Sequence, residues 1–125
     1  MRQSWEKIID AGDATGGVTS GKIDARQCFN LSMVMQSSSG SNAGTVKLQG
    51  SNDICAFGNV PSAFTPAAAS WVDIPSAALL GSGVVASGAT VTLLYRDTCY
   101  AWIRAVWTPS AGAGTITAII NTQGI

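Results

Sequence analysis

The stretch Tyr100–Ile120, YAWIRAVWTPSAGAGTITAII, decides the fold, because it holds two different strand patterns. The first half is apolar on both faces of an extended strand, with Ile103 and Ala105 on one face and Trp102 and Val106 on the other. That pattern is typical of a central strand covered on both sides. The second half, GTITAII, has the alternation expected of a half-buried strand. Proline and glycine in the intervening TPSAGAG predict the turn of a β-hairpin.

Other segments of the chain also favour short strands. QCFNLSMVMQ is the clearest, since Leu31, Met33 and Met35 alternate with smaller or polar side chains. In TVKLQGS, Val46 and Leu48 share one face, and we expect it to pair with the preceding strand as an antiparallel hairpin across the loop SSSGSNAG. Further strands are expected at SWEKIID, GKIDA, WVDIP and ATVTLLY. Six or more short strands separated by turn residues predict an all-β antiparallel β-sandwich, with a single jelly roll as the favoured architecture.

The chain length of 125 residues fits one β-sandwich domain. We expect a flexible amino-terminal segment over about residues 1–26, because its glycine-rich stretch AGDATGGVTSG is a flexible connection. A long excursion, residues 54–70, contains prolines and turn residues that exclude a regular strand over most of its length. Loops of that length tend to be functional or to form interfaces.

Composition excludes several classes of partner. Charged residues make up 11% of the chain and the formal net charge is zero, so we expect no nucleic-acid partner. No stretch approaches the roughly 20 apolar residues that span a bilayer, and no secretory signal is evident, so we expect no membrane insertion. A surface with few charges suits a protein that its neighbours cover.

The three cysteines are Cys28, Cys55 and Cys99, an odd number without a CxxC pair. We favour buried free thiols, made in a reducing cytoplasm, over a disulfide. If two of them do pair, the sequence does not say which one is left over.

Catalytic chemistry finds little support in the sequence. There is no histidine, which removes the usual nucleophile–histidine arrangements and most zinc sites. The seven carboxylates are scattered, and none forms a spaced pair of the kind that cleaves glycosides. We therefore expect no enzyme, no cofactor and no metal. Asn52 and Asp53 at a loop tip favour a turn that caps backbone NH groups over a calcium or sugar contact.

Arg104 lies within an otherwise apolar strand and therefore needs a partner, because a lone desolvated charge is expensive. Asp73 or Asp97 could supply the carboxylate. We favour an ion pair, internal or between subunits, over a ligand-binding arginine.

Large aromatic side chains have two interpretations here. One interpretation is stacking on sugar rings by Trp71, Trp102 and Trp107. Tryptophan also fills sandwich cores and dominates protein–protein contacts, and we favour this second interpretation. The candidate interface or ligand contacts are two of these tryptophans, the arginine and the two phenylalanines of the long loop: Trp71, Trp107, Arg104, Phe57 and Phe64.

Three segments carry a resemblance to a known class. GTVKLQGSND, WVDIP and YAWIRAVWTPSAGAGTITAII resemble small β-sandwich proteins encoded among bacteriophage structural genes. The residues that match their pattern are Gly44, Thr45, Leu48, Gln49, Ser51, Asn52, Asp53, Trp71, Pro75, Tyr100, Arg104, Thr108, Ser110, Gly112, Gly114 and Thr115. The resemblance covers roughly the carboxy-terminal two thirds of the chain. The long stretch Ile54–Ser70 departs from the pattern, which has a shorter loop there.

The resemblance implies a non-enzymatic virion structural protein, such as a capsid shell, decoration or spike component. Its partners would be further copies of itself, as a homo-oligomer, and other virion proteins. It would be located in the virion after assembly in the host cytoplasm. The alternative is a carbohydrate-binding β-sandwich module of a tail fibre or adhesin, with a host-surface glycan as its partner. That alternative predicts an exposed Trp71 or Trp107 near a carboxylate.

Overall fold

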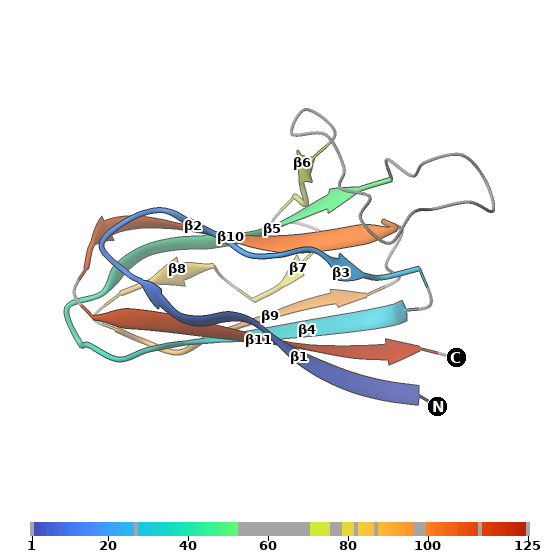
Figure 1. The fold of residues 1–125 in the computed structure, drawn as a ribbon, viewed down its shortest axis with the longest axis horizontal. Coiled ribbons are helices and arrows are strands. Elements are labelled where there is room, and N and C mark those ends of the chain that lie inside the picture. Colours follow the sequence, from blue (N-terminus) through green and yellow to red (C-terminus); the bar gives the residue numbers. More distant parts are fainter. Residues whose placement is uncertain are drawn as a thin grey trace.

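Two antiparallel β-sheets lie face to face in the computed structural model, and no helix occurs in the part of the chain that it describes (Figure 1). The described residues are 2–26, 28–52, 71–75, 79–81, 83–86, 88–96, 100–112 and 114–124. The all-β sandwich predicted from the alternating patterns is therefore confirmed.

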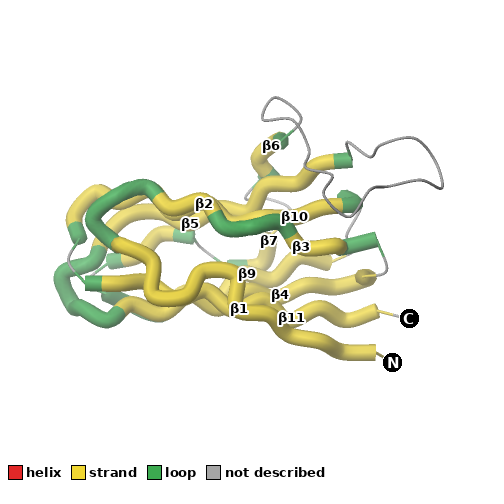
Figure 2. Tube along the Cα trace, in the orientation of Figure 1, coloured by secondary structure: helices red, strands yellow, loops and turns green. Residues whose placement is uncertain are grey.

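Each sheet takes strands from distant parts of the sequence. The five-stranded sheet has, in spatial order, β1 (Arg2–Asp13), β11 (Thr115–Gly124), β4 (Cys28–Ser37), β9 (Val91–Arg96) and β7 (Leu79–Leu80). The six-stranded sheet has β2 (Val18–Thr19), β10 (Trp102–Ala111), β5 (Ala43–Ser51) and β6 (Val72–Asp73), with β3 (Ile23–Asp24) also paired to β10 and β8 (Val84–Val85) also paired to β5. Figure 2 shows the two layers and the loops that join them at one end.

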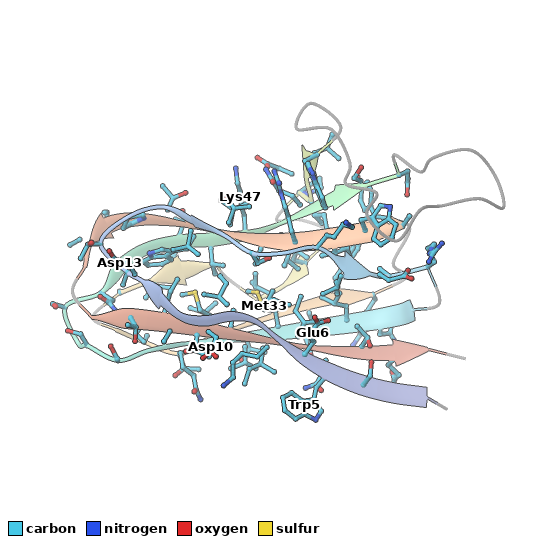
Figure 3. All side chains as sticks on the ribbon, viewed as in Figure 1. Trp5, Glu6, Asp10, Asp13, Met33 and Lys47 are labelled. Carbon is cyan, nitrogen blue, oxygen red and sulfur yellow. The ribbon has the colours of Figure 1, made fainter. Side chains whose placement is uncertain are left out.

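The core lies between the layers and is built from alternate residues of the long strands. One example is Met33, which Figure 3 shows between the two sheets. Side chains from the five-stranded sheet meet those of the six-stranded sheet in a single cluster. Its main members are Leu31, Met33, Met35, Val91, Leu93, Tyr95, Ile116, Ala118 and Ile120 on one side and Val46, Leu48, Ile103, Ala105 and Trp107 on the other. The period of two thus sets which residues are buried.

Both hairpins predicted from the sequence are wrong. β4 pairs with β11 and β9, whereas β5 pairs with β10, so the loop between β4 and β5 crosses from one sheet to the other. In the same way β10 and β11 lie in opposite layers, and TPSAGAG leads from one to the other (Figure 1). The physical reason is that strand alternation and turn residues reveal a chain reversal but not the partner strand. A reversal within one sheet and a crossing to the sheet about 10 Å away have the same local pattern.

The amino-terminal segment predicted to be flexible instead contributes three strands. β1 runs antiparallel to β11 from the pair Arg2 and Gly124 to the pair Asp13 and Thr115. The register shifts after Lys7, where a bulge places Ile9 in the core while Trp5 points away from the sandwich (Figure 3). Regular alternation along SWEKIID would place Trp5, Lys7 and Ile9 on one face, and the bulge is the reason that they do not share it.

Several predictions fall outside the described residues. The long loop 54–70, including Phe57 and Phe64, is among them, and so are the side chains of all three cysteines. Asp53 and Asp97 are outside as well. Asn52 lies within the described part, and its side-chain oxygen accepts a hydrogen bond of 2.8 Å from the backbone NH of Ala101. Asn52 therefore binds a backbone NH group that is 49 positions away, and this contact is not the local turn that the sequence predicted.

Candidate functional site

Five polar and aromatic side chains gather on the outer face of the six-stranded sheet. We call them the Arg104 cluster: Lys47, Gln49, Trp71, Asp73 and Arg104. Cross-strand pairing positions three of them, since Arg104 on β10 lies opposite Gln49 on β5, and Gln49 lies opposite Asp73 on β6. Opposed residues of antiparallel strands point to the same face, so the three side chains form a row across the sheet.

Hydrogen bonds run along this row without a break. Arg104 Nε donates to Gln49 Oε1 at 2.8 Å, and Gln49 Nε2 donates to Asp73 Oδ1 at 2.8 Å. Lys47 Nζ lies 3.1 Å from the Asp73 carboxylate. The Gln49 amide therefore connects the arginine to the carboxylate, and its orientation is fixed at both ends.

Asp73, one of the two carboxylates expected as a partner of Arg104, does not bind it directly, and the other, Asp97, lies outside the described residues. Asp73 forms its ion pair with Lys47, and Gln49 separates it from Arg104. Arg104 instead lies over the indole of Trp71, with its guanidinium carbon 4.3 Å from the ring centroid. A guanidinium stacked on an indole gains cation–π attraction and shields one face of the ring.

The electrostatics of the cluster follow from these contacts. Partial burial lowers the pKa of Arg104 from its usual value, yet a guanidinium remains charged at any ordinary pH. Hydrogen bonds from Gln49 and then Lys47 lower the pKa of Asp73. Two cations and one carboxylate give the cluster an excess positive charge. The cluster can therefore bind a hydrogen-bond acceptor or a carboxylate of a partner.

We expect the Gln49→Ala variant to raise the pKa of Asp73 towards the ordinary aspartate value. A group whose folded pKa is lowered stabilises the fold above its unfolded pKa of about 3.9 and loses that contribution as the pH falls through the folded pKa. A carbon-detected NMR titration of the Asp73 carboxylate measures this directly. Lys47→Ala, which removes a second hydrogen bond and a positive charge from the same carboxylate, should also raise the pKa. Equal pKa values in Gln49→Ala and the wild type would contradict this assignment.

A second aromatic side chain lies on the same outer face. Trp102 is almost fully buried there, between the Lys22 ammonium at 5.3 Å and the Arg26 guanidinium at 5.2 Å from its ring centroid. Asp24 binds Arg26 through two side-chain hydrogen bonds, of 2.9 and 2.6 Å, and this lowers the pKa of Asp24. The indole of Trp102 thus packs beneath two long cationic side chains. Further along the same face of β10, Arg104 and Val106 are only half-buried, so the predicted cover on both faces is present at Trp102 and does not extend along the whole strand.

Trp107 was predicted as an interface or ligand contact, and the structure places it in the core instead. Its side chain has no exposed surface, and its Nε1 donates to the Ala14 carbonyl at 3.2 Å within the core. It therefore contacts neither a ligand nor a neighbouring subunit. The alternation along β10 explains this, because Trp107 shares the inward face with Ile103 and Ala105. Of the five candidates, the structure brings together Trp71 and Arg104.

Sequence reasoning missed two members of the cluster, Lys47 and Gln49. Both alternate with Val46 and Leu48 and so lie on the other face of the strand, but nothing in the sequence linked them to Arg104. The missing information was that β5 lies beside β10, which places Gln49 opposite Arg104. Figure 3 shows Lys47 pointing outward from the same face.

The described part of the chain has neither a cluster of metal ligands nor a helix that could span a membrane. No group of three histidine, cysteine, aspartate or glutamate side chains gathers there as metal ligands would. No helix in that part is long and apolar enough to cross a membrane.

Comparison with known proteins identifies a fold and no family. No family model matches the chain, and no curated protein matches it. Among solved structures, the chain is similar to the SPBc2 prophage-derived protein YomS, with a TM-score of 0.58 and 10% sequence identity. The match covers 97% of this chain and 92% of that protein. At that identity the likeness shows a shared fold.

Proposed function

We propose that this protein is a non-enzymatic structural component of a bacteriophage virion that acts by assembling with copies of itself and with other virion proteins. The observation that carries the proposal is the shared sandwich, which extends over nearly the whole of both chains, with a protein derived from a prophage. The motif resemblance to sandwich proteins of phage structural genes supports the same class independently. In this proposal the protein resides in the virion after assembly in the host cytoplasm.

The topology supports the jelly-roll architecture as part of the proposal. Consecutive long strands alternate between the sheets, so that β4, β5, β9, β10 and β11 belong to the five-, six-, five-, six- and five-stranded sheets in turn. Alternation of this kind arises when two Greek keys wrap around one core.

The outer face of the six-stranded sheet is the proposed assembly surface. The Arg104 cluster is held in place before any partner arrives, so little side-chain entropy is lost on binding. Arginine and tryptophan are enriched among the residues that dominate protein interfaces. Val84, which is substantially exposed, lies opposite Thr45 of β5 on the same face and adds apolar area.

The copy number of this chain in purified particles, measured by quantitative mass spectrometry, tests the proposal. Hundreds of copies would indicate a shell or decoration protein, and a handful would indicate a spike or tail component. Absence from the particle would refute the virion role. Arg104→Glu should reduce incorporation into particles, whereas Lys7→Glu, an exposed cation on the other sheet, should not.

The alternative of a carbohydrate-binding module needs an accessible indole. Trp107 is buried and Trp71 has Arg104 against one face of its ring, so neither residue favours the alternative.

A further inference from the structure

A groove of about 460 Å³ lies on the opposite side of the molecule, over the five-stranded sheet. It is lined by residues 30–32 of β4, 94–96 of β9 and 121–123 of β11. Leu31 and Tyr95 point into the core. The side chains of Asn30, Ser32, Leu94, Arg96, Asn121 and Gln123 therefore form the outward lining.

The outward side chains form two rows across the strands. In one row Trp5 of β1 lies opposite Asn121, Asn121 opposite Ser32, and Ser32 opposite Leu94. In the other, Gln123 lies opposite Asn30 and Asn30 opposite Arg96. Neighbouring strands are about 4.8 Å apart, so each row presents one side chain per strand at that spacing.

The chemistry of the lining is that of neutral hydrogen bonding. Among the described residues of the lining, amides and a hydroxyl predominate, no carboxylate occurs, and Arg96 is the one cation. The amides are ordered, because Asn30 Nδ2 donates to Gln123 Oε1 at 3.1 Å. That bond leaves Asn30 Oδ1 as an acceptor and Gln123 Nε2 as a donor, side by side.

Trp5 supplies an aromatic platform one strand beyond the lining, because it lies on β1 opposite Asn121. Its side chain is 69% exposed and points away from the sandwich (Figure 3). An indole exposed to that extent beside a polar groove has no role in the core, and it offers a flat apolar face to the axial CH groups of a sugar ring. The interstrand spacing is also close to the length of one pyranose unit, so a chain lying across the strands would meet one side chain per sugar.

We propose that this groove binds a linear oligosaccharide, with Trp5 stacking on one sugar and the side chains of Asn30, Asn121 and Gln123 binding hydroxyls of the next units. The inference does not rest on the virion role, because it concerns a different face of the molecule. A protein partner fits the groove less well, since interface centres are apolar and Leu94 is the main apolar side chain in the lining.

NMR of the nitrogen-15-labelled protein tests the proposal, because its four tryptophans each give a separate indole signal. The probes are maltohexaose, cellohexaose, chitohexaose and hexagalacturonate, titrated into the millimolar range. We expect at least one to shift the Trp5 indole signal and the side-chain amide signals of Asn121 and Gln123. The buried Trp107 signal should stay in place.

Two exposed substitutions and one control locate the site. Trp5→Ala and Asn121→Ala should each weaken the binding, Trp5→Ala by about tenfold or more. Trp71→Ala on the opposite sheet should leave the affinity unchanged. The proposal is overturned if no probe shifts these signals or if Trp5→Ala binds as well as the wild type. A Trp5 signal that moves with protein concentration and not with sugar would also overturn it and would assign Trp5 to a contact between copies.

Discussion

Trp107→Ala is expected to destabilise the fold by about 3–5 kcal/mol, the cost of deleting a large buried aromatic side chain. Trp107 is fully buried. On its two neighbouring strands it lies opposite Val46 of β5 and Val18 of β2. Deletion also leaves the Ala14 carbonyl without the donor that now reaches it at 3.2 Å. Chemical denaturation monitored by circular dichroism would measure the loss, together with a fall in Tm of roughly 10 °C or more.

Trp5→Ala is the matched control, because the same substitution is made at an exposed side chain. It should change the free energy of unfolding by no more than about 0.5 kcal/mol. If Trp107→Ala does not fold, Trp107→Phe provides the measurement. That variant keeps most of the ring volume but removes the indole NH, and should cost about 1–3 kcal/mol. Equal stability of the Trp107 and Trp5 variants would contradict the burial of Trp107.

Gly44→Ala is the second substitution with a large expected effect. A Cβ atom at Gly44 would lie 2.8 Å from Pro109 Cα and 2.9 Å from Trp107 Cη2, and closer still to the Thr108 carbonyl oxygen. Because two of these three contacts are with backbone, β5 and β10 would have to move apart. We expect a loss on the order of 3 kcal/mol from this overpacking, measured by the same denaturation experiment.

Gly40→Ala is the control for this prediction. A Cβ at Gly40 would have nothing within 4 Å, so the variant should be as stable as the wild type or slightly more stable. A Gly44→Ala protein as stable as Gly40→Ala would show that β5 does not approach β10 as closely as described here. The two glycines differ in their surroundings, which the sequence does not reveal.

The candidate site was partly predictable. An arginine in an apolar strand signals a partner, and the sequence pointed to Arg104 and Trp71 for that reason. The partner itself was not predictable, because it depends on which strand lies beside β10. Trp107 was misplaced among the contacts because a strand apolar on both faces gives no indication of which tryptophan is inside. The oligosaccharide groove was missed for a similar reason, since its lining comes from three strands that are distant in sequence.

By itself, the sequence determined the class of fold and the buried face of most long strands. Leu31, Met33 and Met35 are inward, as are Ile116, Ala118 and Ile120, because a period of two places alternate residues on one side. Only the tertiary structure decided which strands pair and which connections cross between the sheets. Register also depends on it, as the bulge in β1 shows by turning Ile9 inward. The physical reason is that alternation is a local property, whereas partner choice depends on the packing of two sheets around one core.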